Sequence, residues 1–302
     1  MSDNCDGAGR PRITGGIDVG SSAIKTVLLE HHDQECGGAC TSRGKGYRVI
    51  ARRTDRLRHR DVRSVAEESY REALAQAGLR ADQVDYLATT GEGELIEFRT
   101  GHFYGMTAHA RGGRELVPEA ASALDIGALH ARAMVIDDRG RALRYRMTSQ
   151  CASGSGQFLE NIGRYLGVAL EEIGPISLTA DTPEICSGIC AVLAETDVIN
   201  MVSRGISTSN IVKGIHQSMA GRYLRLLSSA GVRGHVLVTG GLAQDVGLLA
   251  ALTQAAEAQN SPIVFRSHER SALAGALGAA LWGAFRARKL AREGVRFSAG
   301  AA

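Results

Sequence analysis

Two cysteines stand at the starts of segments whose apolar residues have helical spacing. Cys151 precedes a segment in which Phe158 and its apolar neighbours recur at intervals of three and four, and Cys190 opens a similar segment. The positive end of a helix dipole stabilises a thiolate, which can then act as a metal ligand or a nucleophile. An iron–sulfur cluster usually takes four cysteines. The sequence therefore predicts a cluster that a partner subunit completes.

The remaining cysteines have weaker signals. The chain has six cysteines in 302 residues and no secretion signal, which indicates a reducing compartment. Metal binding or redox chemistry is therefore favoured over disulfide bonds as the role of these cysteines. Cys36 and Cys40 lie in a polar, glycine-rich insertion that we interpret as a flexible hairpin loop, because no second pair with zinc-like spacing follows. Cys186 comes four residues before Cys190. It could compete as a ligand, but a small buried residue is the favoured interpretation.

The first apolar strand, Ile13–Val19, has an aspartate at its end, and a glycine turn with two hydroxyls follows it. A carboxylate at a strand end, next to backbone N–H groups that point at an anion, can hold phosphate and magnesium. The pattern is not a Walker A sequence, since no Gly-Lys-Ser/Thr opens a helix, and an ordinary hairpin turn would need no ligand. The residues of this predicted phosphate cradle are Asp18, Gly20, Ser21, Ser22 and Lys25.

The same pattern returns about a hundred residues later. The strand from Ala121 ends in Asp125-Ile126-Gly127, and a hairpin with its turn at 138–140 follows. Two copies of strand, Asp-x-Gly and hairpin predict two related domains that face one nucleotide. Gly240 and Gly241 follow a third apolar strand, at 235–239, and open a further helix. Paired glycines permit the backbone to approach a flat ligand such as adenine, although close packing of strand and helix is the alternative.

Composition excludes several classes of function. The formal net charge is +3, and no run of lysine and arginine with interleaved aromatics occurs, so nucleic acid is not an expected partner. No apolar run reaches the roughly 20 residues that span a bilayer. Nothing at the N-terminus has the form of a signal peptide. We therefore expect no membrane partner and a cytoplasmic location.

The alternation of strands and helices predicts an α/β fold with two ATPase-like subdomains. Residues 13–120 are expected to form the first subdomain and residues 121–270 the second, which carries the helices of the two cysteines. A closing helix at 271–290 is expected to pack back on the first subdomain. Residues 1–12 and 291–302 are expected to be tails, the first of them disordered.

The motifs Asp18-Val-Gly-Ser-Ser, Asp125-Ile-Gly and Thr239-Gly-Gly resemble the two phosphate motifs and the adenosine motif of the actin/hexokinase/heat-shock ATPase superfamily. The two cysteine segments narrow the resemblance to the BadF/BadG/BcrA/BcrD ATPase family, over about residues 13–285. Members of this family activate 2-hydroxyacyl-CoA dehydratases or are ATP-binding subunits of benzoyl-CoA reductase. The strings that begin at Asp125, Ser149 and Ile189 are most similar to the second group.

The resemblance implies an actin-like (ribonuclease H-like) fold, with duplicated mixed sheets flanked by helices and a nucleotide cleft between them. It also implies that Cys151 and Cys190 bind a [4Fe–4S] cluster shared with a homologous ATPase subunit, and that ATP and Mg²⁺ lie near Asp18 and Asp125. Two catalytic reductase subunits and ferredoxin, the electron donor, are the other implied partners. ATP hydrolysis would move the domains and lower the potential of the cluster. The reduction of an aromatic acyl-CoA would take place on the catalytic subunits.

The chain departs from the dehydratase activators at two places. Activators usually continue Asp-Ile-Gly with Gly-Gln-Asp, where this chain has Ala128, Leu129 and His130, so either subunit of the pair could be the one that hydrolyses ATP. Glu92 and Glu94 stand where activators carry an aromatic and a basic residue. Three alternatives stay open: a homodimeric dehydratase activator, a small-metabolite kinase on the same fold, and an assembly subunit that binds nucleotide without hydrolysing it.

Overall fold

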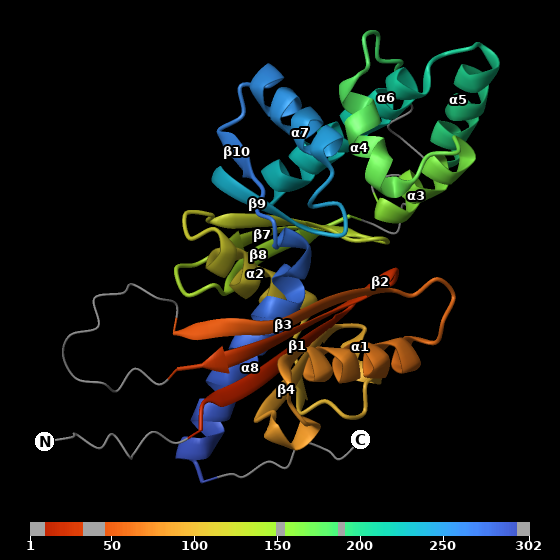
Figure 1. The fold of residues 1–302 in the computed structure, drawn as a ribbon. Coiled ribbons are helices and arrows are strands. Elements are labelled where there is room, and N and C mark those ends of the chain that lie inside the picture. The colour runs from red at the N-terminus through yellow and green to blue at the C-terminus, as the bar shows by residue number, and fades with distance from the viewer. Residues whose placement is uncertain (1–9, 33–45, 149–154, 187–190, 295–302) are drawn as a thin grey trace, which may run out of the picture. The chain divides into compact units, whose positions relative to one another are not determined.

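The computed structural model describes residues 10–32, 46–148, 155–186 and 191–294 (Figure 1). The chain divides into two compact units. Unit 1 comprises residues 1–108 and 275–302, and unit 2 comprises residues 109–274. The chain thus passes from unit 1 to unit 2 after residue 108, inside a helix, whereas the predicted boundary lies after residue 120. It returns at the start of the last helix.

Unit 1 contains a five-stranded mixed sheet in the order β3-β2-β1-β4-β5. The first three strands form an antiparallel meander, and the other two run parallel to β1. The strands are β1 Arg12–Val19, β2 Ala23–His31, β3 Tyr47–Arg56, β4 Tyr86–Gly91 and β5 Gly101–His102.

Alternate residues of β1 face two different helices, α1 (Val62–Ala77) and α8 (Ala274–Arg292). Ile13 and Ile17 belong to an apolar core with residues of α1, while the Thr14 hydroxyl donates to the Ala280 carbonyl of α8. Helix α1 has a capping residue at each end. Asp61 accepts a hydrogen bond from Ser64 N at 2.9 Å, and Gly78 ends the helix at φ +66°. Two short 3₁₀ turns complete the unit, η1 Ala81–Gln83 and η2 Gly93–Leu95.

Unit 2 repeats the arrangement with the strand order β10-β9-β6-β7-β8. Strands β6, β7 and β8 form the meander, and β9 and β10 are the parallel additions. The predicted α/β fold with duplicated mixed sheets is confirmed. The strands are β6 Ser122–Ile126, β7 Ala131–Ile136, β8 Ala142–Met147, β9 Gly234–Gly240 and β10 Ile263–Arg266.

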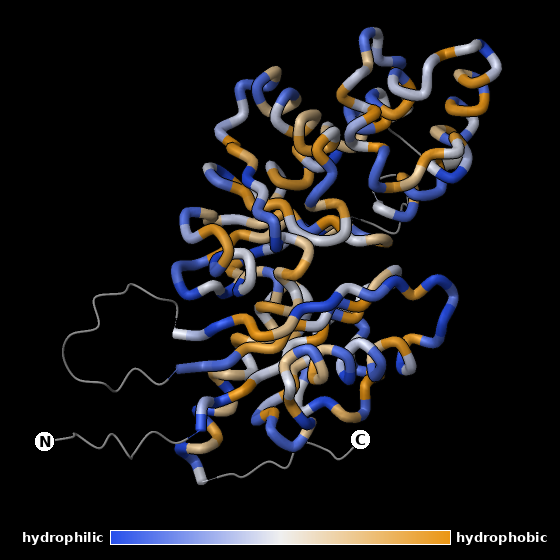
Figure 2. The backbone as a smooth tube through the Cα atoms, viewed as in Figure 1, coloured by the Kyte–Doolittle hydropathy of each residue, from blue (hydrophilic) through white to orange (hydrophobic). Residues whose placement is uncertain are grey.

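The helices of unit 2 hold most of its apolar core. Figure 2 shows apolar segments in the strands and along the helices that pack on them. The longest of the described helices is α6 (Thr208–Ser229), whose Tyr223 is wholly buried. Burial raises the pKa of the Tyr223 phenol far above its ordinary value. The other helices are α2 Gly105–Leu116, α3 Gly156–Tyr165, α4 Leu170–Leu178, α5 Ala191–Ser203 and α7 Val246–Ala258, and η4 Ser271–Leu273 is a 3₁₀ turn.

Two helices differ from the sequence prediction. Helix α4 was not predicted, because it is short and carries Pro175. Helix α7 begins at Val246, five residues after Gly241, where Asp245 caps it by accepting a hydrogen bond from Leu248 N at 2.9 Å. The helices that follow the two cysteines, α3 and α5, are present as predicted. In the described ranges, none of the helices has the length and apolar content of a membrane span.

Helix α2 approaches the start of α8 without room for a side chain. A Cβ atom on Gly112 would overlap the Ala274 carbonyl oxygen, so the two backbones touch. The neighbouring Gly113 differs, since its Cβ would lie 3.7 Å from the nearest atom, Leu237 Cδ2. Only the first of these adjacent glycines is required by packing.

Gly112→Ala should destabilise the protein by about 3 kcal/mol, because α2 and α8 must separate to admit the methyl group. Gly113→Ala, its matched control, should be neutral or stabilising by about 0.5–1 kcal/mol, since alanine favours the helix. Chemical denaturation of both variants measures the difference. Equal free energies of unfolding would contradict the backbone contact.

Candidate nucleotide site

Three polar residues form a row across the sheet of unit 1, where β1 and β4 end. Asp18 on β1 is in register with Lys25 on β2 and Thr90 on β4, so the three side chains share one face. Lys25 Nζ lies 3.7 Å from Asp18 Oδ2, and both side chains are nearly buried, at 11% and 8% exposed. The Thr90 hydroxyl is buried and has no hydrogen-bond partner within the described residues. A buried, unpartnered hydroxyl beside a carboxylate fits a ligand that supplies the missing partner.

The backbone beside this row is close-packed. Gly91 has φ +68°, and its Cβ would overlap the Val19 carbonyl oxygen and lie 3.2 Å from Asp18 Oδ1. Glu92 N donates to the Val19 carbonyl at 2.9 Å, which joins the loops after β1 and β4. Gly20 N donates to the Ala23 carbonyl at 3.1 Å in the tight turn of the predicted cradle. Ser21 and Ser22 in that turn are exposed, and the whole predicted cradle lies at one edge of the sheet.

Unit 2 contains the same row. Asp125 on β6 is in register with Arg132 on β7 and Thr239 on β9. Arg132 Nη1 lies 3.3 Å from Asp125 Oδ2. Gly240, which follows the threonine, has φ +89°, and its Cβ would lie 2.5 Å from the Ile126 carbonyl oxygen and 2.6 Å from Asp125 Oδ1. Each unit therefore carries a base, an aspartate and a threonine in register, with a glycine after the threonine.

A histidine completes the row of unit 2. His109 on α2 is 4% exposed, and its Nδ1 lies 3.1 Å from Thr239 Oγ1 and 3.5 Å from Asp125 Oδ1. Asp125 thus has a basic side chain near each carboxylate oxygen. Sequence reasoning missed Thr90, Arg132 and His109, because register across strands and the placement of α2 are not local properties. A Thr-Gly pair at the end of both β4 and β9 was the available signal for the threonines.

The loop after Asp125 is joined to the start of α3. Gly127 N donates to the His130 carbonyl at 2.8 Å and closes the turn. Gly156 N donates to the Gly127 carbonyl, and Gln157 N to the Ala128 carbonyl, both at 2.9 Å. The first N–H groups of a helix lack partners within the helix, so this loop satisfies two of them. Movement of the loop must therefore move the first turn of α3.

The loop after Thr90 is held from within unit 1. Thr89 Oγ1 donates to the Gly93 carbonyl at 2.9 Å and lies 3.0 Å from His102 Nδ1. Burial lowers the pKa of the His102 imidazole, which favours the neutral ring at pH 7. Glu92 and Glu94 in this loop are exposed to solvent.

The two predicted adenosine glycines have different surroundings. Gly240 is required by its backbone conformation and by its closeness to Asp125. A Cβ on Gly241 would have only the Ile126 carbonyl oxygen nearby, at 4.0 Å. The packing of unit 2 does not require a glycine at this second position. We therefore still predict that a bound ligand requires Gly241.

The predicted iron ligands Cys151 and Cys190 lie outside the described residues, as do Cys36 and Cys40. Cys186 is buried in the apolar core, with its Sγ 4.0 Å from the Ala194 carbonyl oxygen, and it lies before α5 rather than in a helix. Its prediction as a small buried residue is confirmed. The described residues contain no group of three or more His, Cys, Asp or Glu side chains that could hold a metal ion.

Comparison with known proteins identifies the family. The model of the BadF/BadG/BcrA/BcrD ATPase family matches residues 16–283. The chain belongs to this family. It is 58% identical to a benzoyl-CoA reductase subunit of Thauera aromatica over 291 residues, which are 96% of this chain and 99% of the relative. The predicted family resemblance is therefore confirmed.

Solved structures support the same assignment. The activator of 2-hydroxyisocaproyl-CoA dehydratase from Clostridium difficile, determined with bound ADPNP, superposes with a TM-score of 0.80 at 28% identity and covers 94% of this chain and 98% of its own. Component A of (R)-2-hydroxyglutaryl-CoA dehydratase from Acidaminococcus fermentans gives a TM-score of 0.78 at 27% identity, with 92% and 99% covered. The fold described above is the fold of these activators.

The pair Gly240 and Gly241 gives a direct test of the predicted adenosine motif. Gly241→Ala should leave the free energy of unfolding within about 0.5 kcal/mol of the wild type, yet weaken ATP binding at least about tenfold, because its methyl group would occupy the space of the base. Gly240→Ala should instead destabilise the fold by about 1–3 kcal/mol. Calorimetric titration with ADPNP and thermal unfolding separate the two effects. Unchanged ADPNP affinity of Gly241→Ala would refute the adenosine assignment.

Proposed function

We propose that this chain is the ATP-binding, electron-activating subunit of a benzoyl-CoA reductase. The observation that carries the proposal is its 58% identity to the Thauera benzoyl-CoA reductase subunit across almost the whole of both chains. The same comparison supports an enzyme complex in which this chain is one subunit. Its relatives at about 30% identity include two proteins named as activators of dehydratases, which are different enzymes from benzoyl-CoA reductase.

The polar row of each unit supports binding of ATP with Mg²⁺ by the loops that follow it. Asp18 and Asp125 are the carboxylates that would hold the hydrated metal ion, since Mg²⁺ prefers oxygen ligands and retains several waters. Lys25 beside Asp18 would compensate phosphate charge, and the buried Thr90 hydroxyl would donate to a phosphate oxygen. Gly127, Gly240 and Gly241 would give the nucleotide access to the backbone. The relative with bound ADPNP supports a nucleotide as the ligand.

The hydrogen bonds between the loop after Asp125 and α3 support a route from nucleotide to redox centre. Hydrolysis changes the charge next to Asp125, and the loop at Gly127 and Ala128 accepts the first N–H groups of α3. Because α3 follows Cys151 by only a few residues, a shift of this loop would alter the surroundings of that thiolate. Loss of a γ-phosphate is an established way to release such a loop.

Cys151 and Cys190 would supply two ligands to a [4Fe–4S] cluster, and a homologous ATPase subunit would supply the other two. The donor set fits, because both are thiols and α5 begins directly after Cys190. When bound, the cluster supplies one-electron transfer at low potential. The proposed assembly is a cytoplasmic heterotetramer of two ATPase subunits and two catalytic subunits, with ferredoxin as electron donor.

A homodimeric activator of a 2-hydroxyacyl-CoA dehydratase is the second candidate. The TM-scores of 0.80 and 0.78 to two dehydratase activators favour it. The lower identity to these proteins, and the Ala128-Leu129-His130 continuation, favour the reductase. Purification with the neighbouring genes co-expressed distinguishes them, since the reductase subunit would elute with a distinct ATPase partner and reduce benzoyl-CoA with ATP.

The cysteine assignment is tested by iron and sulfide analysis of the complex purified without oxygen. Cys151→Ser and Cys190→Ser should each lose the bridging cluster, because each removes one of its thiolates. Cys186→Ser is the matched control, a buried cysteine of the same segment, and should retain the iron. Full iron content in the Cys151 and Cys190 variants would contradict the proposal and would favour a kinase or an assembly subunit.

Asp18→Asn should lower the ATP turnover of the complex at least about tenfold, since the amide is a poorer Mg²⁺ ligand than a carboxylate. Asp82→Asn, an exposed aspartate of the same unit, should leave turnover unchanged. Circular dichroism checks that the variant is folded, because Asp18 also compensates the buried Lys25. Wild-type turnover in Asp18→Asn would mean that the partner subunit hydrolyses the ATP.

A further inference from the structure

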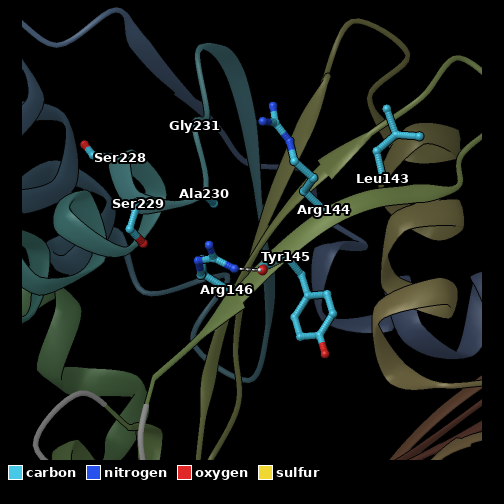
Figure 3. Close-up of a pocket in the computed structure, with 8 residues that line it drawn as sticks. All are labelled: Leu143, Arg144, Tyr145, Arg146, Ser228, Ser229, Ala230 and Gly231. Atoms are coloured by element: carbon cyan, nitrogen blue, oxygen red, sulfur yellow. Dashed lines mark hydrogen bonds between the residues drawn. The ribbon is translucent and has the colours of Figure 1, made fainter.

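Strand β8 is an edge strand of the unit 2 sheet, and its two faces carry different side chains. Arg144 and Arg146 point to the side of α6, and Tyr145 points to the opposite side (Figure 3). Leu143, Tyr145 and Met147 alternate with the arginines, and all three are exposed, at 60%, 48% and 48%. An exposed edge strand with apolar side chains is a site where another protein can dock.

A pocket of about 430 Å³ lies between β8 and the end of α6. The residues that line it include Arg144 and Arg146 of β8 and Ser228 and Ser229 of α6 (Figure 3). Arg225 precedes Ser229 by one helical turn and therefore lies on the same side of α6. The surface formed by Arg144, Arg146 and Arg225 around this pocket is called the arginine surface below.

The positive charge of the arginine surface is not compensated. Within the described residues, no carboxylate makes an ion pair with Arg144, Arg146 or Arg225, whereas Arg48, Arg53 and Arg141 each have one. The sequence explains the difference, since no Asp or Glu occurs from Val198 to Gln244, a stretch that includes all of α6 and β9. A concave surface lined by one sign of charge attracts partners of the opposite sign and speeds their association.

The end of α6 accounts for only part of this charge. A cation near a helix C-terminus stabilises the helix dipole by about 0.3–1 kcal/mol. Arg144 has that position, because its Nη2 lies 3.6 Å from the site of a Cβ on Gly231. Arg146 instead donates a long hydrogen bond, 3.5 Å, to the carbonyl of its neighbour Tyr145. Tyrosine, methionine and arginine are also the residue types enriched at protein interfaces.

We infer that the arginine surface and the exposed side of β8 form the docking site for an acidic electron-donor protein. The inference rests on the proposed function, because a donor is needed only if Cys151 and Cys190 hold a redox centre. The donor would give up one electron to the cluster that Cys151 and Cys190 would hold, and no covalent bond would change.

Chain geometry supports an electron donor over another acidic partner. Arg146 precedes Cys151 by five residues, so their Cα atoms are at most about 18 Å apart. A donor that contacts Arg146 would therefore lie next to the segment that carries the predicted cluster ligand. Complementary charge mainly raises the association rate and sets the orientation of the partner, which suits a carrier that must also leave.

The test measures how fast a reduced, strongly acidic ferredoxin reduces the complex in stopped-flow absorbance without oxygen. The variant is Arg144→Glu/Arg146→Glu. The control is Arg63→Glu/Arg80→Glu, which reverses two exposed arginines of unit 1 and changes net charge equally. Titanium(III) citrate serves as the reductant that needs no protein docking site.

The second-order rate constant of the variant should fall at least about tenfold at low ionic strength, and the difference should shrink in high salt. The control double variant and reduction by titanium(III) citrate should match the wild type. Equal ferredoxin rates in an iron-containing complex would overturn the docking proposal alone. Loss of a subunit from the variant complex on size-exclusion chromatography would also overturn it, since the surface would then be a subunit interface. A wild-type complex without iron would overturn the proposed function as well.

Discussion

A carboxylate buried at the end of a central strand is the constraint on which the rest of each unit depends. Removing such a charge from water costs several kcal/mol unless a cation and hydrogen bonds compensate it. Asp18 and Asp125 meet this requirement with a base on the neighbouring antiparallel strand, Lys25 or Arg132. Each aspartate also excludes a side chain from the residue that follows the threonine on the parallel strand. One buried charge in each unit thus constrains which residues stand in register with the aspartate, and contributes to the requirement for glycine after the threonine.

The sequence predicted those parts of the site that are local. The strand ends at Asp18 and Asp125, the Asp-x-Gly repeats and the helices after the cysteines follow from patterns a few residues long. The approach of Arg132, Thr239 and His109 to Asp125 could not be predicted in this way, since these residues come from three separate elements. Placing them requires the strand register and the packing of α2. The start of α7 was misplaced because its cap, Asp245, competes with the glycine pair as a helix signal.

The two rows have the same arrangement of residues, but their threonine hydroxyls differ in hydrogen bonding. In unit 2 the threonine hydroxyl bonds to His109, so Thr239 has a partner within the protein. In unit 1 the described residues offer the Thr90 hydroxyl none, although it is equally buried. A buried hydroxyl without a partner costs about 1–3 kcal/mol, which a bound oxygen can recover. The threonine of unit 2 is thus paired within the protein, whereas the threonine of unit 1 has a hydroxyl that a ligand could pair.

One hairpin positions positive charge for two purposes. Arg132 on β7 is in register with Met147 on β8, so it shares a face with that residue, and Arg144 and Arg146 project from the other face. A slip of one residue between β7 and β8 would turn Arg144 and Arg146 away from α6. The register is fixed by the turn of the hairpin, where Asp137 Oδ1 accepts hydrogen bonds from Arg139 N and Arg141 N at 2.9 and 2.8 Å. This polar turn therefore fixes the register of β8 against β7 and, with it, the arginine surface.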